Sequence, residues 1–251
     1  MNSAKKLPFW HKGRPASDDD HIAPLDFLQG AGLIDAAAAY NQFVAGQQNS
    51  GLVKQTGWDI SQLNNNNTLQ SYSFSIEDVN TKTICATIAW NRHFTGKYPF
   101  EPLPQNDADL RLELWAADSN NPDNFSLLDY SDSLADNIEH IYFNTHPEYK
   151  SYKLIVTYGS TQTQSVSQEY AVAWNVIEKQ NAGDIGWFDL NADGIVDNSD
   201  TTVMLDNWVL SLTSPGSFSY GDINSNGTVD ANDFEILLKN INRKAAWRTD
   251  N

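Results

Sequence analysis

Oxygen-bearing side chains recur at fixed intervals in two stretches toward the C-terminal end of the chain. The first stretch spans residues 189–200, and the second spans residues 222–233, which begin 33 residues later. Each has Asp or Asn at positions 1, 3, 5, 9 and 12 of a twelve-residue loop, and Gly at position 6, where the chain must turn sharply. Hard oxygen ligands in this order are what Ca²⁺ requires. The two stretches therefore predict two calcium sites.

The predicted ligands are side-chain oxygens, except at position 7, where a backbone carbonyl serves. They are Asp189, Asn191, Asp193, Ile195, Asp197 and Asp200 in the first loop, and Asp222, Asn224, Asn226, Thr228, Asp230 and Asp233 in the second. Position 12 is Asp where an EF-hand has Glu, so each loop must close more tightly to offer both oxygens. The first loop has four carboxylates and the second has three. We therefore expect the first loop to bind calcium more tightly.

Each loop is followed by a segment with the apolar spacing of a helix. The aligned residues are Val203, Met204, Leu205 and Trp208 in the first copy, and Ile236, Leu237, Leu238 and Ile241 in the second. Residues 183–188 and 214–221, which precede the loops, are poor helix sequences. We therefore expect each unit to be a loop followed by one helix. The alternative is an acidic, Asn-rich linker, and the matching helices argue against it.

The charge of this region favours a bound cation. Residues 180–238 contain ten Asp or Glu and no Lys or Arg. Such a concentration of like charge destabilises a compact module. Two Ca²⁺ ions would reduce the charge from −10 to −6, and their binding would supply folding free energy.

A duplicated loop-plus-helix unit with Asp at position 12 resembles the type I dockerin, a module that docks onto cohesin domains. The resemblance implies two Ca²⁺ ions and a cohesin-type protein domain as partner, which the family reads through loop positions 10 and 11. These positions hold Asn198 and Ser199 in the first copy, and Ala231 and Asn232 in the second. They differ from the Ser-Thr pair common in cellulosomal dockerins and from each other, which argues against binding in two symmetric orientations. A calcium-stabilised cap without a partner is the alternative.

Composition excludes several other classes of function. A net charge of −16 and a pI near 4.4 argue against binding to nucleic acid or to anionic membranes. No apolar run has the length of a transmembrane helix. The acidic, Asn-rich composition suits an extracellular, secreted protein, although residues 1–10 do not form a signal peptide. Cys85 is the only cysteine and is expected to be a buried apolar residue.

Several short segments between residues 55 and 178 alternate polar and apolar residues. They are residues 71–76, 83–90, 110–115, 152–158 and 169–174. Turn-rich pieces separate them, which predicts an antiparallel β-sandwich. The expected domains are a loop and helix at 1–50, the sandwich at 51–179 and the dockerin-like module at 180–251. The fold class is thus mostly β, followed by a small α-helical, EF-hand-like module.

Two features resemble subtilisin-like serine proteases. The stretch Pro24-Leu25-Asp26, followed by the run Gly30 to Ala37, resembles the segment after the catalytic serine helix in that family. The order of the strand-like segments resembles the jelly-roll domain that follows the catalytic domain. Together these resemblances cover about residues 22–178. They imply a helix that is a remnant of a protease domain, a jelly-roll sandwich that acts as spacer or stabiliser, and a non-catalytic accessory region of a secreted protease.

The catalytic residues of that family are missing from the chain. No Gly-Thr-Ser-Met-Ala motif occurs, and no Gly-flanked nucleophile lies near any of the histidines. These are His11, His21, His93, His140 and His146. We expect His140 to be a strand residue with Glu139 or a cross-strand neighbour as partner. The prediction is that this chain has no catalytic residues and is not itself an enzyme.

The alternative function is a carbohydrate-binding or hydrolytic sandwich of a polysaccharide-degrading system. Trp58, Trp90, Trp115 and Trp174 could stack on sugars, but the last three lie in alternating segments and are expected in the core. A hydrolase would need a pair of carboxylates in a groove, and no pair stands out. Asp107 and Asp109 begin one strand-like segment and could hold a third Ca²⁺, although a polar strand entry is the simpler interpretation.

Overall fold

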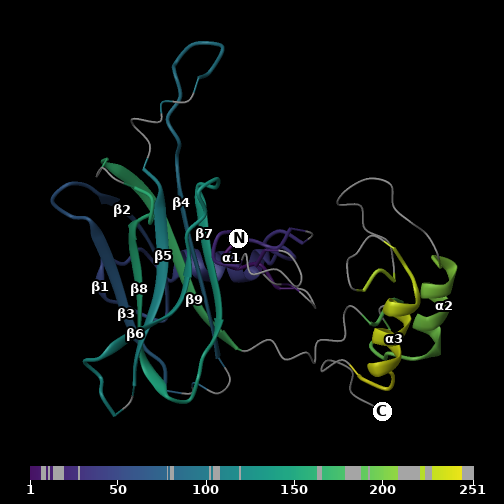
Figure 1. Ribbon diagram of the computed structural model, residues 1–251. Coiled ribbons are helices and arrows are strands. Elements are labelled where there is room, and N and C mark those ends of the chain that lie inside the picture. The colour runs from purple at the N-terminus through teal and green to yellow at the C-terminus, as the bar shows by residue number, and fades with distance from the viewer. Residues whose placement is uncertain are drawn as a thin grey trace. The chain divides into compact units, whose positions relative to one another are not determined.

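The computed structural model describes residues 1–6, 10, 12–13, 20–27, 29–77, 79, 82–101, 103, 108–118, 120–162, 166–178, 188–191, 193–208, 221–223 and 228–244. The chain divides into two compact units (Figure 1). The first comprises Met1–Lys5, His11–Asp26 and Leu33–Lys179, and the second comprises Lys6–Trp10, Phe27–Gly32 and Gln180–Asn251. The expected domain limits stay predictions. In the described ranges no helix is both long enough and apolar enough to span a membrane.

The described strands form two sheets in the first unit (Figure 1). They are β1 (Gly51–Leu52), β2 (Thr56–Leu63), β3 (Leu69–Ser75), β4 (Lys82–Trp90), β5 (Leu110–Asp118), β6 (Phe125–Ser131), β7 (Ile138–Asn144), β8 (Tyr149–Tyr158) and β9 (Gln168–Glu178). One sheet has the order β1-β3-β8-β5-β6 and the other β2-β9-β4-β7. All neighbours are antiparallel except β1 and β3. The prediction of a mostly β, sandwich-like fold is confirmed.

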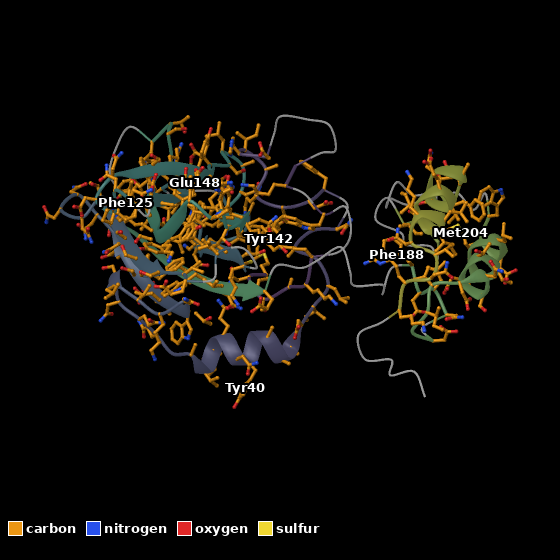
Figure 2. The ribbon with its side chains drawn as sticks, turned by 90° about the horizontal axis from the view of Figure 1, so that it is seen from below. Tyr40, Phe125, Tyr142, Glu148, Phe188 and Met204 are labelled. Carbon is orange, nitrogen blue, oxygen red and sulfur yellow. The ribbon has the colours of Figure 1, made fainter. Side chains whose placement is uncertain are left out.

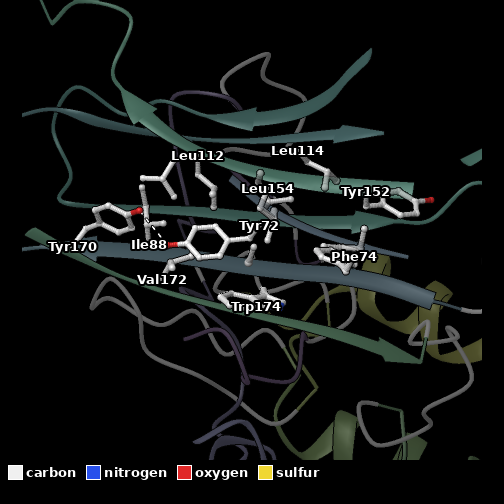
Figure 3. Packing of buried hydrophobic residues seen from close by; sticks show 14 of the residues in the cluster. Tyr72, Phe74, Ile88, Leu112, Leu114, Tyr152, Leu154, Tyr170, Val172 and Trp174 are labelled. Carbon is white, nitrogen blue, oxygen red and sulfur yellow. Dashed lines mark hydrogen bonds between the residues drawn. The ribbon is translucent and has the colours of Figure 1, made fainter. Parts of the chain in front are cut away.

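The hydrophobic core lies between the two sheets (Figure 3). On β5, Leu110, Leu112 and Leu114 are fully buried, whereas the side chains between them are partly exposed. Across the core, the rings of Tyr72 and Trp174 pack with centroids 5.1 Å apart. Every second side chain of such a strand leaves water when the two sheets pack together. The hydrophobic effect therefore favours the strand conformation in these segments.

Strand β4 is buried on both faces along most of its length. Its outward-facing residues Cys85 and Thr87 are covered by Asn2, whose backbone carbonyl accepts a hydrogen bond from the Cys85 thiol. His140 on β7 is fully buried opposite Thr87, and its Nδ1 lies 2.8 Å from the Thr87 hydroxyl. The prediction of a buried Cys85 and of a strand residue His140 with a cross-strand partner is confirmed.

Trp115 corrects one expectation about the tryptophans. Trp90 and Trp174 are buried in the core as predicted, but Trp115 faces outward from the five-stranded sheet. It follows the inward-facing Leu114, so the pleat directs it to the opposite side. Its indole N–H donates to Glu113 Oε2 at 2.7 Å. This face of the sheet therefore presents a half-buried aromatic side chain fixed by a carboxylate.

The helix expected within residues 1–50 is confirmed as α1 (Ala36–Val44). Asp35 caps its N-terminus, because its carboxylate accepts the Ala38 N–H at 2.8 Å. Gln42 is the one buried residue of the helix, and its amide donates to the Trp174 carbonyl at 3.1 Å. A polar side chain therefore anchors α1 to the sheet.

The second unit contains α2 (Asn198–Asp206) and α3 (Ala231–Lys239), each nine residues long. The helices expected after the loops are confirmed, but both begin at loop position 10, inside the predicted loops, because the position-9 residues Asp197 and Asp230 cap them. One cluster of buried apolar side chains joins the two copies, and Phe188 and Met204 of this cluster are labelled in Figure 2. Its members are Phe188, Val196, Met204, Ile223, Val229 and Leu237. The predicted absence of helices before the loops concerns residues 183–187 and 214–220, which lie outside the described residues.

Candidate functional site

Residues 189–200, called loop 1, begin with an aspartate that organises the first turn. Asp189 is 9% exposed. One of its carboxylate oxygens accepts the Asp193 N–H at 3.0 Å, and the other accepts the Gly194 N–H at 2.7 Å. Gly194 has φ +87°, a conformation that a side chain would strain. The Gly at position 6 is therefore required by the turn, as the loop pattern predicts.

Three further predicted ligands of loop 1 each hold a backbone N–H two residues ahead. Asn191 accepts from Asp193 at 2.9 Å, and Asp193 accepts from Ile195 at 2.8 Å. Asp197 accepts from Ser199 at 2.7 Å and caps the N-terminus of α2. Short polar side chains favour such local turns. The result is a coiled backbone on which each oxygen ligand has a fixed position.

Asp200 closes loop 1 from its last position. Its side chain is fully buried, and one oxygen accepts the N–H groups of Leu190 and Asn191 at 2.6 and 3.2 Å. The other oxygen accepts the Asp197 N–H at 2.7 Å. A residue at position 12 thus ties positions 2, 3 and 9 together. The short Asp at this position reaches the start of the loop, as the predicted tight closure requires.

Residues 222–233, called loop 2, repeat this arrangement where they are described. Asp222 and Asp233 are 3% and 0% exposed. Asp233 accepts the Asp230 N–H at 2.9 Å, and Asp230 accepts the Asn232 N–H at 2.8 Å while it caps α3. Thr228 is also described, whereas Asn224 and Asn226 lie outside the described residues. The two loops therefore share the hydrogen bonds that join position 12 to position 9.

The donor set of loop 1 fits a calcium ion in its chemistry. In the ranges that the structure covers, no three His, Cys, Asp or Glu side chains lie close enough to hold a metal ion. Two of the six predicted ligands, the side-chain amide of Asn191 and the backbone carbonyl of Ile195, are neutral oxygen donors that do not belong to these four side-chain types. Each carboxylate has about four lone-pair positions, and the backbone N–H groups use only some of them. All six ligands are oxygens, the type that Ca²⁺ prefers. Which of them bind the ion stays a prediction.

The residues predicted to contact a partner lie on the surface of the module. Asn198, Ser199, Ala231 and Asn232 are all exposed at the first turns of α2 and α3. Exposed apolar side chains accompany them on the same helices, with Leu205 at 53% and Leu238 at 51% exposure. The surface thus offers both polar and apolar groups to a partner, and the role of these residues stays a prediction.

Sequence reasoning missed the residues that end the two helices. Asn207 and Asn240 are the C-caps, and their amides donate to the carbonyls of Val203 and Ile236 at 3.0 and 2.8 Å. These carbonyls would otherwise lack a partner at the helix end. The signal was available, because the two asparagines occupy the same position of the repeat.

A cluster of carboxyl groups in the sandwich was also missed. Glu139 is fully buried and accepts hydrogen bonds from the Ser131 hydroxyl and the Ser133 N–H at 2.5 and 2.8 Å. Burial raises the pKa of Glu139 to about 8. Burial and the nearby Asp132 raise the pKa of Asp109 to about 6. The partner of Asp109 suggested for a third calcium, Asp107, lies outside the described residues, so that hypothesis stays a prediction.

The comparisons agree with the repeat geometry. Residues 187–242 match the family model described as dockerin type I domain. Dockerin type I domains bind calcium, and dockerin domains bind cohesin domains. The match supports a calcium-binding, cohesin-binding module in this part of the chain, which the resemblance of the repeat implied. No curated protein matches the chain.

Solved structures similar to the chain cover about half of it. The pre-peptidase C-terminal domain of collagenase from Bacillus anthracis has 11% identity and a TM-score of 0.33, and the match covers 51% of this chain and 96% of that domain. The periplasmic g-type lysozyme inhibitor PliG of Aeromonas hydrophila has 9% identity and a TM-score of 0.31, with 53% and 99% covered. Similarities of this size do not support an inference about function.

Proposed function

We propose that this chain is a non-catalytic accessory region that binds two Ca²⁺ ions through loops 1 and 2 and docks a secreted protein onto a cohesin-type domain. The observation that carries the proposal is the repeated closing geometry. In both loops the position-12 aspartate is fully buried, and it exchanges hydrogen bonds with the position-9 aspartate that caps the next helix. The match of residues 187–242 to the dockerin type I domain supports it.

The two loops would hold calcium through the ligands predicted from the sequence. Bound calcium would supply positive charge among the carboxylates and folding free energy for the module. The chain's own contribution is to position the oxygens. Asp189 and Asp200 fix the start and end of loop 1 by accepting backbone N–H groups. This positioning lowers the entropic cost of ordering the ligands when calcium binds.

The partner surface would be formed by loop positions 10 and 11 and the exposed faces of α2 and α3. Asn198 and Ser199 differ in size and chemistry from Ala231 and Asn232. A partner surface that fits Asn198 and Ser199 would leave polar groups without hydrogen-bond partners if it met Ala231 and Asn232 instead. We therefore propose docking in a single orientation.

The proposed parent is a subtilisin-like protease, and this part of the proposal rests on the sequence resemblance of residues 22–178 alone. The sandwich would serve as spacer or stabiliser and adopt the jelly-roll form. The strand order supports this form, because β2 pairs with β9, β3 with β8, β4 with β7 and β5 with β6, so that successive pairs nest across two sheets. An extracellular location follows from the proposed docking role.

Calcium titration of the full chain by calorimetry tests the proposal. The unmodified chain should bind two ions and then bind at least one member of a cohesin panel, with both activities lost in EDTA. The double variant Asp189→Ala/Asp222→Ala should bind neither. Asp206→Ala is the matched control, because it removes an exposed acid of α2 outside the loops. Loss of calcium binding in the control, or calcium-independent cohesin binding, would contradict the proposal.

A second candidate is glycan binding by the outer face of the five-stranded sheet. The outward position of Trp115 favours it, since aromatic rings fixed at a surface can stack on sugars. Trp115 lies opposite Lys153 on β8, whose ammonium group sits 3.9 Å from the centre of the Phe125 ring. Retention of the full chain on insoluble polysaccharide, lost in Trp115→Ala but kept in Trp58→Ala, would support this function. No retention on several glycans would remove it.

A further inference from the structure

The residues that follow α3 return to loop 1 and pair with it. The Val196 N–H donates to the Arg243 carbonyl at 2.9 Å, and the Asn242 N–H donates to the Val196 carbonyl at 2.8 Å. Ile195 and Lys244 form the adjoining antiparallel bridge. We call residues 242–244 the C-terminal clamp. It joins the end of the second repeat to the middle of the first loop.

The backbone conformation of Asn242 makes this return possible. Asn242 has φ +70°, in the left-handed region that asparagine tolerates better than most residues. It follows the helix end at Asn240, where the Arg243 N–H donates to the Asn240 carbonyl at 3.3 Å. The chain therefore reverses directly after α3 and runs back along loop 1.

The clamp also contacts the residue before loop 1. The guanidinium of Arg243 lies 5.7 Å from the centre of the Phe188 ring. Phe188 is 5% exposed and belongs to the cluster shared by both repeats (Figure 2). The clamp thus contacts the residue before loop 1 and the backbone next to the position-7 residue of the loop.

One peptide group links the clamp to a predicted calcium ligand. The Ile195 carbonyl, the position-7 ligand, and the Val196 N–H belong to the same planar peptide unit. In a trans peptide these two groups point in opposite directions. The hydrogen bond from the Val196 N–H to Arg243 therefore fixes the direction of the Ile195 carbonyl away from the clamp. The Ile195 N–H is held separately by Asp193 at 2.8 Å.

We propose that the C-terminal clamp presets loop 1 for calcium, so that the affinity of the first loop is controlled by the end of the second repeat. The proposal rests on the proposed calcium function of loop 1. It implies coupling through the backbone, because residues 242 and 243 exchange backbone hydrogen bonds with Val196 of loop 1. Ordering of α3 delivers the clamp, and the clamp then orients the carbonyl.

Two substitutions at residue 242 separate the clamp from the helix. Asn242→Pro removes the N–H that donates to Val196 and is restricted to φ near −65°, so it opens the clamp. Pro is tolerated shortly after a helix end, so α3 is retained. Asn242→Gly keeps both the N–H and the left-handed conformation and is the matched control.

Calorimetric Ca²⁺ titrations of the full chain in two backgrounds assign the effect to one loop. Asp222→Ala leaves loop 1 to titrate, and Asp189→Ala leaves loop 2. In the first background, Asn242→Pro should bind calcium about tenfold more weakly than Asn242→Gly, the effect expected for two backbone hydrogen bonds. In the second background, the two variants should agree within about twofold. Hydrogen exchange of the Val196 amide in EDTA should be faster in the Pro variant.

The outcomes distinguish this proposal from the proposed function. Equal loop 1 affinities of the two variants would overturn the clamp while leaving calcium binding intact. An equal loss in both backgrounds would overturn it as well, since it would show general destabilisation of the module. Absence of calcium uptake by the unmodified chain would overturn the proposed function and the clamp together.

Discussion

Asp197 and Asp200 exchange hydrogen bonds, because the backbone N–H of each donates to the carboxylate of the other at the start of α2. The same exchange joins Asp230 and Asp233 at the start of α3. Positions 9 and 12 of each loop are therefore helix caps as well as predicted calcium ligands. Part of the module's stability should consequently persist when calcium is removed.

Asp200→Ala tests this double role. It leaves the N–H groups of Leu190, Asn191 and Asp197 without their acceptor. We expect it to lower the unfolding free energy of the second unit by about 2 kcal/mol even in EDTA, the usual effect of losing a cap and a buried acceptor. Thermal unfolding followed by far-UV circular dichroism measures this, with Asp206→Ala as the control. An effect seen only with calcium present would mean that Asp200 acts solely as a ligand.

The affinity difference between the loops can be tested by exchanging one residue type. Position 5 is Asp193 in loop 1 and Asn226 in loop 2. Because the number of carboxylates tunes calcium affinity, Asp193→Asn should weaken the tighter site, and Asn226→Asp should strengthen the weaker one, each by about tenfold. Calorimetry of the full chain separates the two sites. A strengthened site in Asp193→Asn would contradict the expected order.

Glu139 predicts the direction of a pH effect on the sandwich. Burial raises its pKa from 4.5 to about 8 in the folded state. Its contribution to stability is therefore complete below about pH 4.5 and is lost progressively as the pH rises toward 8. Glu139→Gln should remove this loss, since the amide oxygen can still accept the Ser133 N–H.

Urea unfolding from about pH 5 to about pH 9 measures the Glu139 effect as a difference between the two proteins. The variant should gain on the unmodified chain as the pH rises. Asp109 contributes in the same direction over a lower range, because its pKa is raised from 3.8 to about 6. Glu148→Gln, an exposed acid between β7 and β8, is the control. Parallel pH profiles for the unmodified chain and Glu139→Gln would refute the assignment.

Gly159 tests how tightly the carboxyl cluster is packed. A Cβ at this position would lie 2.4 Å from Asp109 Oδ2 and 3.1 Å from Asp132 Oδ1. We expect Gly159→Ala to lower the unfolding free energy of the sandwich by about 1–3 kcal/mol, as overpacking does. Gly96→Ala is the matched control, because a Cβ there meets nothing within 4 Å. Equal midpoints of chemical unfolding would show that the cluster moves aside without cost.

The sequence predicted the calcium loops well because their geometry is local. The hydrogen bonds described above within loop 1 join residues that are at most ten positions apart in the sequence. The residue types and their spacing are therefore enough to predict most of the structure of the loop. The clamp at residues 242–244 was not predicted, since it depends on a contact between distant parts of the two repeats.

The strands that sequence reasoning missed depart from simple alternation. On β2 the inward positions include Gly57 and Asp59, while Ile60 is exposed, so the apolar pattern is inverted. Asp59 is satisfied by the Tyr72 hydroxyl and the Gln47 amide, a long-range arrangement that no local pattern encodes. On β6 a register shift opposite Leu114 and Trp115 interrupts the alternation.

The two-residue strand β1 has a consequence for how this protein behaves beside other copies. Gly51 and Leu52 run parallel along the outer edge of β3, and the Val53 N–H donates to the Ser73 carbonyl at 2.8 Å. A long unpaired edge is a template on which sheets of neighbouring molecules aggregate. Covering β3 with a strand too short to serve as a template itself limits such growth. A sandwich held close to other copies of itself can then remain separate from its neighbours.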